Sequence, residues 1–172
     1  MKLYINDSKM ENNKRFLIFD ALGTLKYTVS IEHASFGTKI SVYDFKMKRV
    51  AKIRKRDVMS FSIFSIFCKK VLCNKRKIRL VVSRLNFKDF VYIAGINWFF
   101  SGSLLDKNFE IVNVDKSVVM RQTKNNNTLN AAYELDINEE QHEILCLCVA
   151  LCVNILSAKP IKNTIKAVGL AD

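Results

Sequence analysis

The cysteines and histidines of this chain are its first candidates for metal binding or nucleophilic chemistry. In Cys146-x-Cys148-x-x-x-Cys152, Cys148 and Cys152 share one helix face, whereas Cys146 points about 200° away from Cys148. All three lie among Leu and Val, so we expect them to pack in a core as small hydrophobic side chains. We expect His33 and His142 to be ordinary polar surface residues, because neither has a second ligand at metal spacing. The sequence predicts no metal site.

Motifs that support nucleotide or acyl-transfer chemistry are also missing. There is no Gly-x-Ser-x-Gly elbow and no Gly-x-Gly-x-x-Gly fingerprint, and five glycines make phosphate-cradling loops hard to build. Glu139 and Glu140 are adjacent carboxylates, but their place in the first turn of a predicted helix favours pairing with the helix dipole over catalysis. We therefore expect a non-enzymatic protein with no catalytic residues and no cofactor.

Basic residues on two predicted strands are the remaining candidates for ligand binding. In a strand over residues 50–56, alternation puts three cations on one face, with like-facing residues about 6.6 Å apart. A second strand over residues 75–82 carries a similar ladder. If the strand order sets the ladders side by side, they form a patch with the reach of one phosphorylated headgroup or several phosphates. The candidate residues are Lys52, Arg54, Arg56, Lys75, Lys77 and Arg79.

The net charge of +12 is concentrated around these ladders. Residues 46–84 hold 14 of the 28 basic residues and 1 of the 16 acidic residues, so the remainder is close to neutral. This asymmetry indicates a one-signed surface that attracts phosphate-bearing partners, either nucleic acid or an anionic membrane. The alternative is that the basic residues only solubilise exposed strand faces.

The elements that position these residues are predicted to be antiparallel strands, because apolar and polar residues alternate and turn residues recur every 8 to 12 positions or so. At 172 residues, we expect a single domain over residues 1–172. About a dozen strands are predicted, at residues 3–5, 15–19, 25–30, 38–43, 50–56, 60–68, 71–73, 77–83, 90–93, 97–101, 109–112, 118–122 and 131–137. Residues 125–127 are predicted to form a polar loop.

The C-terminal part of the chain predicts one helix that is apolar on all sides. Every residue of 144–156 except Asn154 is apolar, and a helix of that kind must be surrounded by protein. Asn138 and Gln141 match a capping box and Pro160 bars continuation, which predicts a central buried helix over residues 139–157. Its 13-residue apolar run spans roughly 20 Å, short of the roughly 30 Å bilayer core. We expect no transmembrane segment, and we make no structural prediction for the tail at 160–172.

The N-terminal residues and the cysteine count bear on the compartment. Residues 1–20 are interrupted by charged and amide side chains and contain no apolar leader segment. Five cysteines are an odd number, and three of them lie in the apolar helix, so we expect reduced thiols. We expect a cytoplasmic protein, peripheral at the inner membrane surface if it binds lipid.

Several short segments, in this order, resemble the LURP-one-related proteins of the tubby C-terminal-like superfamily. They are Asp20-x-x-Gly23 with Tyr27, Gly37-x-Lys39-x-x-Val42-x-Asp44, Val50-Ala51-Lys52-Ile53 and Tyr133-Glu134-Leu135-Asp136-Ile137, followed by an acidic turn and the apolar helix. The resemblance covers roughly residues 3–158. The chain departs from the family at Met47 and Lys116, where hairpins often have Gly, and at Asn154, where the helix often carries Asp.

The resemblance implies a mainly β (α+β) fold, a closed antiparallel barrel of about 12 strands around a central hydrophobic C-terminal helix. Tubby domains bind phosphoinositide headgroups through basic side chains, and phospholipid scramblases share the superfamily. No local motif here allows the tubby lipid ligands to be carried over residue by residue.

The leading hypothesis is a domain that binds anionic phospholipid headgroups through its basic surface. Nucleic-acid binding ranks second because the sequence shows no alternating aromatic platform, and a protein-interaction module stays open. The oligomeric state is left open.

Overall fold

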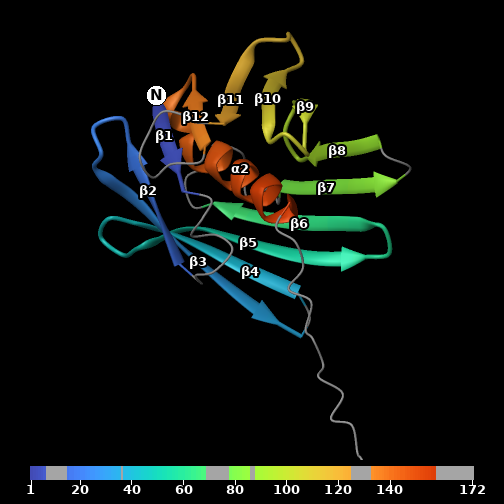
Figure 1. Ribbon diagram of the computed structural model, residues 1–172, viewed down its shortest axis with the longest axis horizontal. Coiled ribbons are helices and arrows are strands. Elements are labelled where there is room, and N and C mark those ends of the chain that lie inside the picture. Colours follow the sequence, from blue (N-terminus) through green and yellow to red (C-terminus); the bar gives the residue numbers. More distant parts are fainter. Residues whose placement is uncertain (7–14, 36, 69–77, 86–87, 125–132, 158–172) are drawn as a thin grey trace, which may run out of the picture.

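A computed structural model describes residues 1–6, 15–35, 37–68, 78–85, 88–124 and 133–157 (Figure 1). These residues form twelve strands, a 3-10 turn and one α-helix. The strands are β1 (Lys2–Ile5), β2 (Arg15–Asp20), β3 (Leu25–Ala34), β4 (Gly37–Asp44), β5 (Arg49–Val58), β6 (Phe61–Cys68), β7 (Ile78–Leu85), β8 (Lys88–Ala94), β9 (Trp98–Ser103), β10 (Asn108–Asn113), β11 (Val118–Lys124) and β12 (Tyr133–Ile137). The helical elements are η1 (Glu140–His142) and α2 (Glu143–Ser157).

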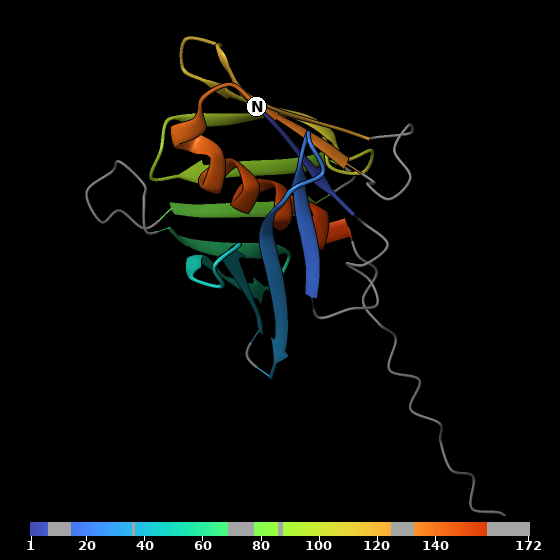
Figure 2. The ribbon, with the colours of Figure 1, turned by 90° about the vertical axis from the view of Figure 1, so that its left-hand side faces the viewer.

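The twelve strands form a single antiparallel sheet that curls into a nearly closed barrel around α2 (Figures 1 and 2). Its order is β8-β7-β6-β5-β4-β3-β2-β1-β12-β11-β10-β9. The first and last strands pair with each other, and the Met1 ammonium group donates a 2.6 Å hydrogen bond to the Ile137 carbonyl. The two edges of the sheet, β8 and β9, are consecutive in the chain and are joined by residues 95–97. The predicted mainly β architecture around a C-terminal helix is confirmed.

The strands form where apolar and polar residues alternate, so that one face of each can be buried against α2. Ile40 and Val42 of β4 and Ala51 and Ile53 of β5 point inward and are buried, while Lys52 of β5 faces outward. The predicted strand at 71–73, the loop at 125–127 and the tail at 160–172 lie outside the described residues.

Helix α2 fills the barrel on all of its faces, as the sequence predicts. Every side chain from 145 to 154 is almost completely buried, including the opposed pair Leu147 and Val149. In the described part of the chain, no helix is long and apolar enough to cross a bilayer.

The start of this helix differs from the capping-box prediction. Residues 140–142 form the 3-10 turn η1, and α2 begins at Glu143. Asn138 does not cap the helix, because its side-chain amide donates to the Val118 carbonyl of the neighbouring strand. Gln141 donates to the Glu139 carboxylate instead of closing a capping box. Contact with the sheet has therefore outcompeted the local cap, a common competition for Asn side chains.

Three hairpins use the same turn, and each turn begins at an Asp or Asn residue. Gly23, Met47 and Lys116 have φ of 75°, 58° and 65°. Each donates its backbone N–H to the carbonyl three residues earlier, that of Asp20, Asp44 or Asn113, at 2.9–3.1 Å. A register shift follows in each strand pair, at Ile18/Phe19, Val42/Tyr43 and Ile111/Val112. The missing glycines therefore leave the turn geometry unchanged, and Met47 and Lys116 adopt the left-handed conformation instead.

Candidate functional site

Strand β5 carries the first of the two predicted basic ladders on the outer face of the barrel. Lys52, Arg54 and Arg56 alternate with inward-facing residues, and the two arginines are exposed while Lys52 is half-buried. The predicted shared face of these three cations is therefore observed. Period-two alternation forces this arrangement, because Ala51 and Ile53 between them enter the core.

The second predicted ladder does not adjoin the first. Strand β6 lies between β5 and β7, and Ser65 pairs with Arg54 on one side and with Arg79 on the other. With strands about 4.8 Å apart, Arg54 and Arg79 start about 10 Å from each other on the same face. The short Ser65 side chain lies between them, so the two guanidinium groups can reach one anionic surface together. Lys75 and Lys77 lie outside the described residues.

Strand β4 adds a cation that the sequence analysis did not select. Lys39 pairs with Arg54 in register and forms a 2.7 Å ion pair with Glu32 of β3. We call Lys39, Lys52, Arg54, Arg56 and Arg79 the basic surface. The alternation of β4 carried the signal for Lys39, since Ile40 and Val42 are apolar and Lys39 therefore faces outward.

The cations of the basic surface are crowded and largely unneutralised. Partial burial and repulsion from nearby cations lower the pKa of Lys52 below its ordinary value. The repelling groups are Arg54, Lys39 and Arg49. Among the described residues, Lys52, Arg54, Arg56 and Arg79 form no ion pair with a carboxylate. An anion bound here would relieve this repulsion.

Exposed aromatic side chains lie beside the basic surface, and the sequence analysis missed them. Phe61 of β6 and Phe90 and Tyr92 of β8 are 39%, 58% and 55% exposed and face outward. The signal was present in β6, where Phe61 and Ile63 share the parity of Ser65 although the opposite face, with Phe64 and Ile66, already supplies the core. A strand that is apolar on both faces at a barrel surface indicates a contact beyond the barrel.

The described cysteines and histidines do not come together as a set of metal ligands. Cys146, Cys148 and Cys152 are buried in α2, and the Cys148 thiol lies 4.0 Å from the half-buried Cys68 thiol of β6. His33 is exposed, whereas His142 is half-buried with its ring edge against Trp98, so its prediction as an ordinary surface residue is wrong. No group of three or more His, Cys, Asp or Glu side chains suited to a metal ion occurs among the described residues.

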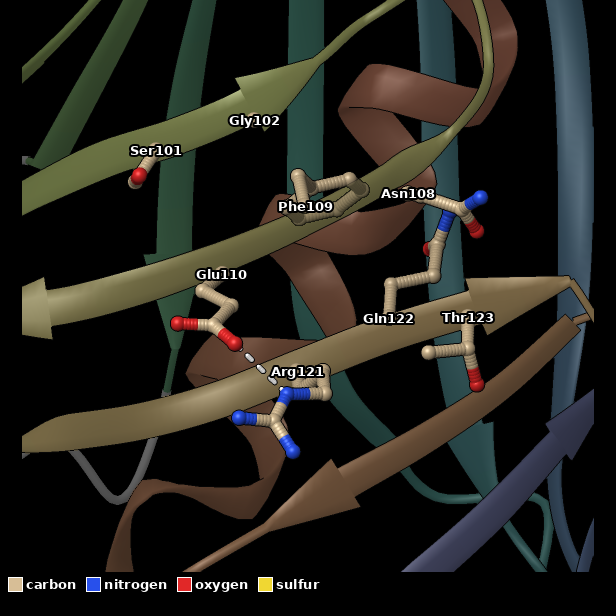
Figure 3. Close-up of a pocket in the computed structure, with 8 residues that line it drawn as sticks. All are labelled: Ser101, Gly102, Asn108, Phe109, Glu110, Arg121, Gln122 and Thr123. Carbon is tan, nitrogen blue, oxygen red and sulfur yellow. Dashed lines mark hydrogen bonds and ion pairs between the residues drawn. The ribbon is translucent and has the colours of Figure 1, made fainter.

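A surface hollow of about 290 Å³ lies over β9, β10 and β11, strands that carry none of the basic surface (Figure 3). It is lined by Ser101, Gly102, Asn108, Phe109, Glu110, Arg121, Gln122 and Thr123. Its two charged groups bind each other, with Arg121 Nε 2.6 Å from Glu110 Oε1. The buried Gln122 amide donates to the Lys107 carbonyl at 2.9 Å. Because these groups are already paired, the hollow offers a ligand less than the basic surface does, where Lys39 is the only one of the five cations with an ion pair among the described residues.

Comparison with known proteins places this barrel in a family. The model of the LURP-one-related family matches residues 1–154, which covers all twelve strands and most of α2. The chain belongs to the LURP-one-related family. A search of curated proteins found no match.

The LURP-one-related fold is also seen in a crystal structure of a protein from Arabidopsis thaliana. That structure aligns with a TM-score of 0.60 at 14% sequence identity, over 90% of this chain and 90% of the other. At 14% sequence identity, the similarity is evidence for a shared fold alone. The arrangement of cations on the outer face of β4, β5 and β7 has therefore to be interpreted from this chain's own residues.

Proposed function

We propose that this LURP-one-related domain is a non-enzymatic cytoplasmic protein that binds anionic phospholipid headgroups, phosphoinositides among them, through its basic surface. The observation that carries the proposal is the crowding of cations around Lys52 on an outward sheet face. The resemblance to the superfamily of tubby domains, which bind phosphoinositides through basic side chains, supports the same ligand class.

The geometry favours a surface over a small soluble ligand. Arg54 and Arg79 are separated by a full strand and lie on the outer face of the barrel. Each cation near an anionic membrane contributes about 1 kcal/mol, so a flat group of them acts additively on a bilayer. The proposal therefore predicts binding that depends on surface charge density.

Vesicle sedimentation tests the proposal. Vesicles of phosphatidylcholine alone are compared with vesicles that also contain phosphatidylserine or a phosphoinositide, each across a salt series. We expect binding to the acidic vesicles and its loss at high salt, because exposed charges are screened beyond about 10 Å at 0.1 M salt. Equal partitioning to neutral and acidic vesicles would end the proposal.

Charge reversal with a matched control locates the binding face. Lys52→Glu with Arg54→Glu should abolish sedimentation with acidic vesicles while the circular dichroism spectrum stays unchanged. The control is Lys116→Glu with Lys124→Glu, which makes the same change in net charge at exposed positions of β11 and its turn. If both pairs weaken binding equally, net charge rather than the basic surface is responsible.

Single-stranded nucleic acid is the second candidate, and the structure strengthens it. The sequence predicts no aromatic platform, yet Phe61, Phe90 and Tyr92 are exposed beside the cations. Aromatic rings next to a basic groove can stack bases. Fluorescence polarisation with labelled oligonucleotides tests this reading. Affinity that persists at physiological salt, without vesicle binding, would reverse the ranking.

A further inference from the structure

The outer face of β6, β7 and β8 carries a continuous apolar patch next to the basic surface. Two rows of paired residues form it. Ile63, Val81 and Tyr92 pair in one row, and Phe61, Ser83 and Phe90 pair in the next. Met59 lies next to these rows in the turn between β5 and β6 and is 98% exposed. The apolar patch consists of Met59, Phe61, Ile63, Val81, Phe90 and Tyr92.

The apolar patch and the basic surface are continuous with each other. Arg56 of β5 pairs with Ile63, so it belongs to the same cross-strand row as Ile63, Val81 and Tyr92. The adjacent row contains Arg54, Ser65 and Arg79. The basic residues therefore lie next to the patch on its side away from the β5–β6 hairpin. An exposed apolar patch bordered by charge marks a contact with another molecule or a membrane.

We propose that the apolar patch enters the boundary between headgroups and acyl chains of an anionic bilayer while the basic surface contacts the phosphates. This inference rests on the proposed function and adds the orientation of the barrel and a second, salt-resistant component of binding. The charge of the border is complementary to anionic lipid. The long Arg and Lys side chains can keep their charged ends at the phosphate level while the rings lie deeper.

The composition of the patch favours a bilayer over stacked bases. Met59, Ile63 and Val81 are aliphatic and lie beside or between the rings, where a base would find no flat partner. Tyr and Phe at such a surface match the membrane interface, where Tyr keeps its hydroxyl hydrated while its ring is buried. Met59 at the tip of a hairpin is placed to enter first.

Single tryptophan substitutions test the insertion directly. The chain's own Trp98 is 4% exposed and supplies a constant background. Phe90→Trp and Met59→Trp should shift to shorter emission wavelengths on phosphatidylserine-containing vesicles and be quenched by brominated phosphatidylcholine. Leu22→Trp is the matched control, because Leu22 is 90% exposed at the tip of the β2–β3 hairpin, at the opposite end of the antiparallel strands. Its emission should not change.

The outcomes separate this inference from the proposed function. Salt-sensitive vesicle binding with unchanged Phe90→Trp and Met59→Trp emission would overturn insertion and leave headgroup binding intact. Failure to bind any vesicle would overturn both. A response of Phe90→Trp to an oligonucleotide but not to vesicles would assign the patch to nucleic acid and overturn the inference.

Partitioning measurements provide a second test that does not depend on a new fluorophore. Phe61→Ser with Phe90→Ser should weaken binding to acidic vesicles by about tenfold per ring, and the binding that remains should lose its salt-resistant component. If the Phe61→Ser/Phe90→Ser variant does not fold, the conservative Tyr92→Trp variant is used instead, and its quenching by brominated lipid is measured. Unchanged partitioning of a folded Phe61→Ser/Phe90→Ser variant would contradict insertion.

Discussion

Gln122 and Asn154 hold each other by two hydrogen bonds inside the barrel, one residue on β11 and the other near the end of α2. The Gln122 amide donates to Asn154 Oδ1 at 3.0 Å, and the Asn154 amide donates to Gln122 Oε1 at 3.2 Å. Both side chains are almost completely buried. This reciprocal pair explains how the helix accommodates Asn154, the one polar residue of its apolar run at 144–156, and it fixes the helix to the wall of the barrel.

The amide pair predicts strong coupling between these two positions. Asn154→Ala should lower the free energy of unfolding by about 1–3 kcal/mol, because the buried Gln122 side chain loses both of its hydrogen bonds to Asn154. Gln122→Leu with Asn154→Leu should cost less than the sum of the single changes, with a coupling of about 0.5–3 kcal/mol in a urea double-mutant cycle. Strict additivity would show that the pair contributes no mutual stabilisation.

The enclosed helix makes its centre intolerant of both cavities and charges. Leu151 is fully buried, so Leu151→Ala should lower the free energy of unfolding by about 2–5 kcal/mol. Lys at Leu147, Val149 or Leu151 should prevent folding, because Val149 points away from the face shared by Leu147 and Leu151 and both faces are buried. Solubility and the cooperativity of thermal unfolding measure this. A cooperatively folded Lys variant at any of the three would contradict the central position of α2.

The left-handed hairpin residues offer stabilising substitutions. Met47→Gly and Lys116→Gly should each raise the free energy of unfolding by up to about 1 kcal/mol, because a side chain at positive φ strains the backbone. Gly23→Ala should have the opposite sign at the equivalent position, where an added Cβ meets nothing within 4 Å. Urea midpoints compare the three variants. A less stable Met47→Gly variant would show that the methionine side chain makes contacts that outweigh the strain.

Lysines with opposite pKa shifts predict opposite effects of removing their charge. The pKa of Lys52 is lowered, so charged Lys52 destabilises the fold below that pKa, and the penalty fades as the pH rises towards the ordinary value of 10.5. Lys52→Met should therefore raise the melting temperature at pH 7 while weakening binding to acidic vesicles. The gain should shrink at alkaline pH.

Lys2→Met is the control for this experiment. The Glu134 carboxylate, 2.6 Å from its ammonium group, raises the pKa of Lys2 through a hydrogen bond and charge attraction. That stabilisation is present below the ordinary pKa and is lost as the pH rises through the folded-state value. Lys2→Met should lower the melting temperature at pH 7 and leave vesicle binding unchanged. A stabilised Lys2→Met variant would contradict the assigned signs.

Cysteine reactivity should follow position in the fold. A hydrogen bond from Cys148 lowers the pKa of the half-buried Cys68 thiol, whereas burial raises the pKa of Cys146 and Cys152. In a Cys73→Ser background, iodoacetamide should modify Cys68 first and reach the helix cysteines only on unfolding. Peptide mass spectrometry measures the order. Early modification of Cys152 in the native protein would indicate that the barrel opens readily.

The sequence by itself determined the elements and their inner faces. Uninterrupted apolar residues around α2 allow only an enclosed helix, and period-two alternation on β5 places Lys52 and Arg54 on the outside whatever the neighbours are. The three hairpin turns that begin at Asp20, Asp44 and Asn113 also depend on local sequence, because turn chemistry acts within a few positions of the chain.

Only the tertiary structure decided which elements meet. The placement of β6 between the two basic strands, the pairing of β1 with β12, and the Gln122–Asn154 contact all join residues far apart in the chain. Local patterns do not specify such pairs, because many strand orders bury the same inward faces equally well. The patch beside Tyr92 was hidden for this reason, since its rings come from strands on either side of β7. The start of the helix is a further example, because Asn138 donates a hydrogen bond to a carbonyl on β11 instead of capping the helix.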